Sequence, residues 1–367
     1  MLSPKTKRNI ARIIPFGVIW LVFSVVYVEV QHGIIGKLNY YPSTGNPYNF
    51  QRTTIITCIG SLVTGLLIGA IEIKYFNKWF IQKSFTKKVL YKSLIYFVII
   101  LSFLIGLTLI ANAVEYRSSI LDHRVWDSLS LFFFSFSFWS VCIYIASIIV
   151  LTQFYNEVSE NIGPEVLYNF LIGKYHRPIE EERIYMFLDM KSSTTIAESL
   201  GHVKYFEMLR EYYADLSESI VNYSGQIYQY VGDEVVVSWK LKDGLQNNNC
   251  IECFFAMKRS ILDQAGKYQQ RFGIVPSFKA GFHVGKVTTG EIGVIKKEII
   301  FTGDVLNTSA RIQGLCNTHS VDIIISGDLA KKLNLQSSFR VESLGENELR
   351  GRGEKVELFT IKNDFSI

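Results

Sequence analysis

The apolar positions of this chain fall into two patterns, long unbroken runs before about residue 155 and shorter, interrupted runs after it. A helix that spans a membrane needs about 20 consecutive apolar residues, whereas a buried helix of a soluble domain is shorter and amphipathic. The early runs therefore predict four membrane-spanning helices within a membrane domain over residues 1–153. They are Ile14–Val30, Thr54–Ile73, Leu94–Val114 and Leu129–Thr152.

The basic residues around these runs predict the orientation of the bundle. Lysine and arginine concentrate on the cytoplasmic side of membrane proteins. The N-terminal tail carries Lys5, Lys7, Arg8 and Arg12. The link between the second and third spans carries Lys74, Lys78, Lys83, Lys87 and Lys88. The opposite loops carry only Lys37, Arg52, Arg117 and Arg124. We therefore expect a multi-pass protein of the inner (plasma) membrane with its N-terminus and its C-terminal half in the cytoplasm.

Two further features of the spans bear on their role. Gly65 and Gly69 have the GxxxG spacing that lets helix backbones approach closely, either between two copies or within one bundle. Glu29, Glu72 and Glu115 lie near span ends, where a carboxylate can reach the membrane interface. No row of intramembrane charges indicates an ion path, which disfavours a transporter.

A connector over residues 154–182 follows the bundle. It contains a helix break at Gly163–Pro164 and a short amphipathic segment, Val166–Ile172. We expect it to couple the bundle to the cytoplasmic domain, since a passive linker would not need an apolar face.

Residues 183–362 alternate between strand and helix patterns. Strands are expected at Ile184–Asp189, on both sides of a tight turn at Val231–Glu234, at "SFKAGFHVG", at Val321–Ile325, and at "FRVESL" and "VELFTI", with a turn at "VTTGEIG". Helices are expected at Ala197–Tyr223, Cys250–Phe272 and Asp304–Leu315. This order predicts an α/β domain, an α+β sandwich with a mixed, largely antiparallel sheet.

Composition narrows the classes of function. The net charge of +5 sits largely beside apolar runs, which fits a membrane protein and not a nucleic-acid binder. Cys250 and Cys253 form a lone CxxC without a second pair or a histidine at metal spacing. A zinc site is therefore not expected, and both residues fit one side of a helix.

Two aspartates end apolar segments of the C-terminal domain. Asp189 follows the buried strand "IYMFL", and Asp233 lies in the tight turn of "YVGDEVV". Carboxylates that converge at one edge of a sheet, without histidine or cysteine, suit hard cations such as Mg²⁺ or Mn²⁺. The alternative is two aspartates that only stabilise turns.

A third motif, "FTGDVLNTSARIQ", places Asn307 and Arg311 four residues apart on one helix face. An amide and a guanidinium so placed could hold a ribose and a phosphoryl group in a transition state.

Together with "FLDMKSST", "YQYVGDEVV", "KAGFHVGKVTTGEIG" and "LRGRGEKVELF", this motif occurs in an order that resembles the class III nucleotidyl cyclase catalytic domain over residues 180–362. The resemblance implies a ferredoxin-like mixed sheet and a head-to-tail homodimer with active sites at the interface. It also implies conversion of a nucleoside triphosphate to a 3′,5′-cyclic nucleotide and pyrophosphate.

The family pattern assigns roles by position. Asp189 and Asp233, with the backbone carbonyl of Met190, would hold two divalent ions, Mg²⁺ or Mn²⁺. Asn307 and Arg311 would come from the other protomer, orienting the ribose and stabilising the α-phosphoryl group in the transition state.

Three positions concern the remaining nucleotide contacts. Arg352 matches the basic residue that contacts the terminal phosphates. Gln229 and Ile300 occupy the two base-recognition positions, where adenylate cyclases usually have Lys and Asp or Thr, and guanylate cyclases have Glu and Cys. Ser193 replaces the usual Phe after the first metal-binding Asp. The prevalence of adenylate cyclases among bacteria favours ATP, with GTP as the alternative.

Two other functions compete with this interpretation. A diguanylate cyclase has a "GGDEF" hairpin, but Val231 stands at its first glycine and that family does not use the Asn307 and Arg311 helix in this way. A non-catalytic nucleotide-binding membrane sensor is the other alternative, because the base-recognition pair is lost. Turnover of ATP or GTP with Mn²⁺, compared with that of Asp189→Ala, would distinguish the enzyme from the sensor.

Overall fold

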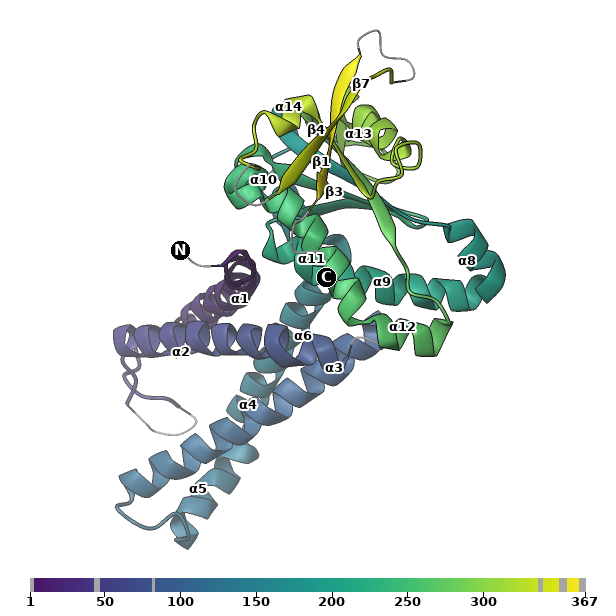
Figure 1. Cartoon of the computed structure of the whole chain (residues 1–367). Helices are drawn as coiled ribbons and strands as arrows, with labels where there is room; N and C mark the ends of the chain where they lie inside the picture. The colour runs from purple at the N-terminus through teal and green to yellow at the C-terminus, as the bar shows by residue number, and fades with distance from the viewer. Residues whose placement is uncertain (1–2, 43–46, 81–82, 336–338, 350–354, 363–367) are drawn as a thin grey trace. The chain divides into compact units, whose positions relative to one another are not determined.

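In the computed structural model the chain forms two compact units (Figure 1). One comprises Lys7–Tyr168, and the other comprises Asn169–Ile367 together with Met1–Thr6. The structure describes residues 3–42, 47–80, 83–335, 339–349 and 355–362.

The first unit is helical, and four of its helices are long and apolar enough to cross a membrane, as the sequence predicts. Its apolar core contains aromatic residues of α1 and isoleucines of α6, among them Phe16, Trp20 and Ile148. The elements of this part of the chain are α1 (Pro4–Ile35), α2 (Phe50–Ile71), the π-helical turn η1 (Glu72–Phe76), α3 (Asn77–Trp79), α4 (Phe85–Glu115), α5 (His123–Phe133), α6 (Phe136–Ile162) and α7 (Pro164–Leu171).

The predicted fourth span, Leu129–Thr152, is wrong at its start. Helix α5 ends at Phe133, and α6 begins at Phe136 after a break. Ser135 caps α6 by accepting a hydrogen bond from the Phe138 amide at 3.2 Å. Phenylalanines flank the break on both sides, so that the apolar run continues through it.

The paired glycines of α2 serve packing within one chain. A Cβ on Gly65 would lie 2.7 Å from the carbonyl oxygen of Phe16, and one on Gly69 would lie 3.0 Å from the Phe16 ring. The GxxxG spacing therefore lets α1 approach α2 closely, which is the intramolecular alternative of the two.

The prediction for Glu72 is also wrong. Its side chain does not reach an interface but is fully buried in the bundle, where it pairs with Lys92. Glu29 and Glu115 are exposed, as expected.

The second unit contains one mixed sheet, as predicted, in the strand order β2-β3-β1-β4-β6-β8-β7, with β5 paired to β4 (Figure 1). Among the described strands, only β4 and β6 pair in parallel. The strands are β1 (Ile179–Met190), β2 (Gln226–Val231), β3 (Glu234–Lys240), β4 (Phe278–Ile292), β5 (Glu298–Thr302), β6 (Ile323–Ser326), β7 (Arg340–Asn347) and β8 (Val356–Lys362).

Helices cover both faces of this sheet. Alternate residues of β1, such as Ile184 and Met186, pack with α9 and α11 in the main core. The intervening residues Tyr185 and Phe187 face the other way and share a smaller cluster with Val305 of α13. The helical elements are α8 (Ser193–Leu200), α9 (His202–Asn222), α10 (Leu241–Leu245), η2 (Gln246–Asn248), α11 (Asn249–Asp263), α12 (Ala265–Phe272), α13 (Asp304–Gly314) and α14 (Gly327–Ala330).

Two predicted helices are each divided in the structure. The expected helix Ala197–Tyr223 is interrupted at Gly201, whose φ of 75° lies in the left-handed region that favours glycine. The expected helix Cys250–Phe272 breaks at Gln264, which caps α11 and precedes α12.

Two other local predictions are confirmed. Helix α6 ends before Gly163, whose φ is 102°, and α7 begins at Pro164. The CxxC cysteines are buried on α11, as expected for two small packing residues. The exact boundaries of the membrane domain, connector and C-terminal domain stay predictions.

Candidate active site

The first candidate metal ligand, Asp189, lies near the end of β1, which has a neighbouring strand on each side. Strand β1 is antiparallel to both β3 and β4, and its residues from Arg183 to Leu188 are buried. Asp189 itself is half-buried. The Met190 side chain belongs to the apolar core, which leaves its backbone carbonyl as the group that could bind a cation.

Asp233 lies in a two-residue turn between β2 and β3. Gly232 adopts a φ of 62°, as hairpin turns of this length require. The Tyr213 hydroxyl, on α9, donates to the Gly232 carbonyl at 2.7 Å, and the Tyr213 and Tyr230 rings lie 4.5 Å apart. These contacts fix the turn, and hence Asp233, against α9.

The two aspartates come together, because β1 pairs with β3 up to Leu188 and Val235, next to the turn that holds Asp233. Burial raises the pKa of Asp189, and the neighbouring Asp233 raises it further, against a lowering effect of Lys279. Burial, Asp189 and Asp233 likewise raise the pKa of Glu234. The structure therefore concentrates negative charge at this edge of the sheet.

Lys279 is a site residue that the sequence analysis did not identify. It lies opposite Asp189 in the β1–β4 register, and its Nζ is 3.5 Å from Asp189 Oδ2. Gln313 Nε2, on α13, donates to the same oxygen at 3.2 Å. The lysine of "SFKAGFHVG" could have been found by pairing that strand with β1.

The donor set fits a divalent cation that also binds substrate oxygens. Among the described residues, Asp233 Oδ2 has no hydrogen-bond partner although it is buried, and an unpaired buried carboxylate oxygen is costly unless a cation or donor approaches it. Within the described ranges, no three His, Cys, Asp or Glu side chains are grouped to hold a metal. The chain thus supplies two carboxylates, and Mg²⁺ in such sites takes its other ligands from water and phosphates.

Helix α13 carries Asn307 and Arg311 and packs very closely on the sheet. A Cβ on Gly281 of β4 would lie 2.2 Å from the backbone nitrogen of Gln313, so only glycine permits this approach. Asn307 is exposed and Arg311 half-buried. In the part of the chain that the structure describes, no hydrogen bond or ion pair joins either residue to Asp189 or Asp233.

The predicted base-recognition residues lie on two different strands. Gln229 is exposed on β2, and Ile300 is half-buried on β5. Arg352 lies outside the described residues.

Comparisons with known proteins agree with this geometry. The family model of the adenylate and guanylate cyclase catalytic domain matches residues 175–363. Adenylate cyclase 2 of Rhizobium meliloti (strain 1021) is 36% identical over 204 residues, which cover 56% of this chain and 56% of that protein. Adenylate cyclase 1 of the same strain is 26% identical over 182 residues, covering 48% of this chain and 27% of that protein. The chain thus spans little more than half of the first relative and about a quarter of the second.

A solved structure shows the same fold. The bacterial light-regulated adenylyl cyclase superposes with a TM-score of 0.54 at 18% identity, covering 62% of this chain and 67% of that chain.

Proposed function

The chain belongs to the adenylate and guanylate cyclase catalytic domain family, and from this premise we propose that it is a membrane-anchored adenylate cyclase, which converts ATP to 3′,5′-cyclic AMP and pyrophosphate. One observation carries the proposal. Asp189 and Asp233 converge at one sheet edge, and no residue that the structure describes forms a hydrogen bond with the buried Oδ2 of Asp233.

Asp189, Asp233 and the Met190 carbonyl would hold two divalent ions, Mg²⁺ or Mn²⁺. When bound, such ions supply Lewis-acid activation of the ribose 3′-hydroxyl and charge neutralisation on the triphosphate. Lys279 is the nearby cation on this protomer, and we assign it to the phosphates. In this structure it faces Asp189 instead, at 3.5 Å.

The transition-state residues come from a second copy of the chain. Neither Asn307 nor Arg311 contacts the carboxylates of its own chain within the described residues. In a head-to-tail homodimer, Asn307 of one copy orients the ribose over the carboxylates of the other. Arg311 donates to the α-phosphoryl oxygens as the 3′-oxygen attacks phosphorus and the bond to the pyrophosphate group breaks.

The choice of ATP over GTP rests on the relatives named adenylate cyclase and on the chemistry of two side chains. Gln229 carries both a donor and an acceptor, so that its amide can pair with either purine edge. Ile300 can only pack against the ring. GTP turnover is the alternative outcome. A second alternative is that the chain binds a nucleotide as a sensor and does not convert it.

The four apolar helices anchor the enzyme in a membrane. The distribution of lysine and arginine supports an inner-membrane protein with the N-terminus and the catalytic domain in the cytoplasm, where nucleoside triphosphates are available.

Complementation tests the shared active site. Asp189→Ala and Arg311→Ala full-length proteins should each lose activity, Arg311→Ala by about 10²–10³-fold because one transition-state donor is removed. Co-expressed and purified as tagged heterodimers, the two variants should recover partial activity, since one of the two interface sites is then intact.

Two exposed residues provide matched controls. Asp263→Asn and Arg259→Ala alter the same residue types on α11 and should leave activity unchanged. Absence of recovery in heterodimers of proven composition would contradict the shared site, and full activity of Asp189→Ala would contradict the metal assignment.

A further inference from the structure

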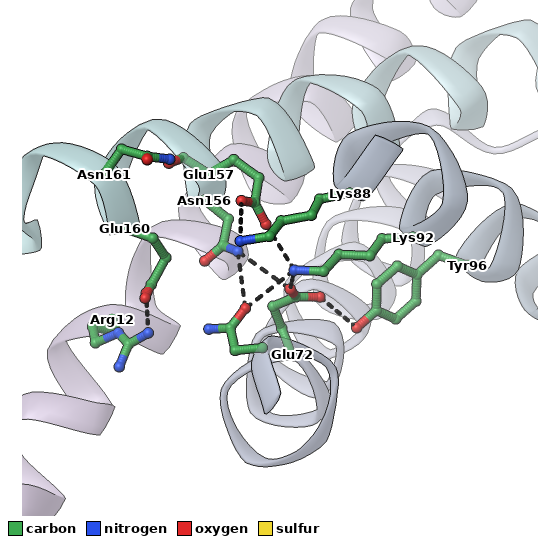
Figure 2. Close-up of polar contacts among 10 residues, drawn as sticks. Arg12, Glu72, Lys88, Lys92, Tyr96, Asn156, Glu157, Glu160 and Asn161 are labelled. Atoms are coloured by element: carbon green, nitrogen blue, oxygen red, sulfur yellow. Dashed lines mark hydrogen bonds and ion pairs between the residues drawn. The ribbon is translucent and has the colours of Figure 1, made fainter. Parts of the chain in front are cut away.

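The helical unit contains a buried charge network that links α4 and α6 to the π-helical turn η1. Lys92 Nζ lies 2.5 Å from Glu72 Oε1 and 2.7 Å from Glu157 Oε1 (Figure 2). All three side chains are at most 1% exposed. We call Glu72, Lys92 and Glu157 the ion network.

Neighbouring polar groups complete this network. The Tyr96 hydroxyl donates to Glu72 Oε2 at 2.9 Å, and Asn156 Nδ2 donates to Glu72 Oε1 at 3.2 Å (Figure 2). Lys88 Nζ lies 3.5 Å from Glu157 Oε2. Two ammonium groups thus face two carboxylates and the formal charges balance, so that the network is not arranged to receive a cation.

The network lies at the end of the bundle from which the chain continues toward the cyclase domain. Glu72 begins η1, Lys92 lies in an early turn of α4, and Glu157 lies close to the last residue of α6. An ion pair between Arg12 and Glu160 also joins α1 to this end of α6 (Figure 2). Single π-helical turns are frequent at functional sites in helices.

A buried ion network contributes little net stability, because replacing it with well-packed apolar residues of similar volume often leaves the protein equally stable or more stable. It does define position, since short charge-assisted hydrogen bonds have narrow geometry. Helix α6 is the element whose position matters most here. The chain runs from it through Gly163 and α7 into β1, the strand that carries Asp189.

We propose that Lys92 is a positioning residue for the cyclase reaction: by joining Glu72 and Glu157 it holds the end of α6 in the position from which two catalytic domains pair productively. This inference rests on the proposed function. An active site divided between two copies depends on their mutual placement, and a misplacement of about 1 Å can cost about 10² in rate.

The test uses full-length protein in lipid nanodiscs and compares Lys92→Met with Lys87→Met. Lys87 lies on the same helix but is exposed, so that it controls for loss of a lysine. We expect Lys92→Met to lower kcat about tenfold while KM for ATP stays within about twofold, because the nucleotide site is untouched. Equal kcat in the two variants would overturn the proposal.

Two further variants separate positioning from folding. Lys92→Met leaves a surplus carboxylate in the interior, whereas Lys92→Met combined with Glu72→Gln keeps the Lys88–Glu157 pair and restores charge balance. We expect the double variant to be folded and still impaired, and Lys92→Arg to recover activity in part. Wild-type kcat in the double variant would show that charge balance alone matters and would overturn the proposal.

A spectroscopic measurement is independent of activity. Ile162, the last residue of α6, is 50% exposed and can be replaced by a spin-labelled cysteine in a Cys58→Ser background, since the other cysteines are buried. The label should be more mobile with Lys92→Met than with Lys87→Met. Equal mobility would overturn the proposal while the proposed function could still hold, whereas wild-type protein that binds ATP without cyclising it would overturn the proposed function and, with it, the role of Lys92 in that reaction.

Discussion

Gly281→Ala is expected to inactivate the enzyme through packing alone. The added Cβ would lie 2.2 Å from the backbone nitrogen of Gln313 and 2.6 Å from its Cα, where real Cβ contacts stay above 3.0 Å. Backbone atoms cannot yield as a flexible side chain does, so α13 must move by close to 1 Å. Overpacking of this kind costs about 1–3 kcal/mol of unfolding free energy. A domain of this size would lose about 2–4 °C in Tm for each kcal/mol.

The substitution should impair catalysis as well as stability. Helix α13 carries Asn307 and Arg311, and displacing a transition-state donor by about 1 Å can lower the rate about 10²-fold. The assay uses the full-length protein. It measures kcat at a temperature below the unfolding transition of the variant, and it measures Tm separately by thermal unfolding. Gly314→Ala is the control, because Gly314 lies on α13 itself and no described residue comes within 4 Å of the added Cβ. If Gly281→Ala kept wild-type kcat and Tm, the close approach of α13 would not be required.

Three other perturbations have defined outcomes. Lys279→Ala should raise KM for the nucleotide about tenfold, since a hydrogen bond to a charged group contributes about 1.5–3 kcal/mol; an unchanged KM would remove it from the phosphate site. Burial alone would raise the pKa of Asp322, but hydrogen bonds from Lys191 and Lys258 lower it. The ionised carboxylate therefore stabilises the fold at pH values above 3.8, the ordinary pKa of an aspartate. Asp322→Asn should therefore lower Tm at pH 7, and the difference should vanish as the pH falls below 3.8 through the depressed pKa of the folded state; a constant difference would contradict this assignment. Gly65→Leu should destabilise the bundle in detergent, because its side chain would meet the Phe16 backbone at 2.7 Å, whereas Gly60→Leu, with open space around it, should not.

Local patterns in the sequence were sufficient for much of the cyclase domain. The apolar run of β1 and the Gly232–Asp233 turn depend on nearest neighbours along the chain, and both are found where predicted. The helix break at Gly201 was missed because the amphipathic pattern continues on both sides of it, while the break depends on one positive φ.

Contacts between distant segments could not be predicted in this way. Lys279 meets Asp189 only because β4 pairs with β1 in a particular register. Glu72 is buried because Lys92 of α4 and Asn156 of α6 reach it across the bundle. A single sequence shows a carboxylate near the end of an apolar run, and its partners depend on how the helices pack.

The most direct test of the account is product identification. Full-length protein with Mn²⁺ would be incubated separately with ATP and with GTP, and cyclic AMP, cyclic GMP and cyclic dinucleotides would be quantified by mass spectrometry, with Asp189→Ala as the blank. We expect cyclic AMP from ATP, formed by the wild type and not by the variant. Bound nucleotide without any cyclic mononucleotide from either substrate would contradict it.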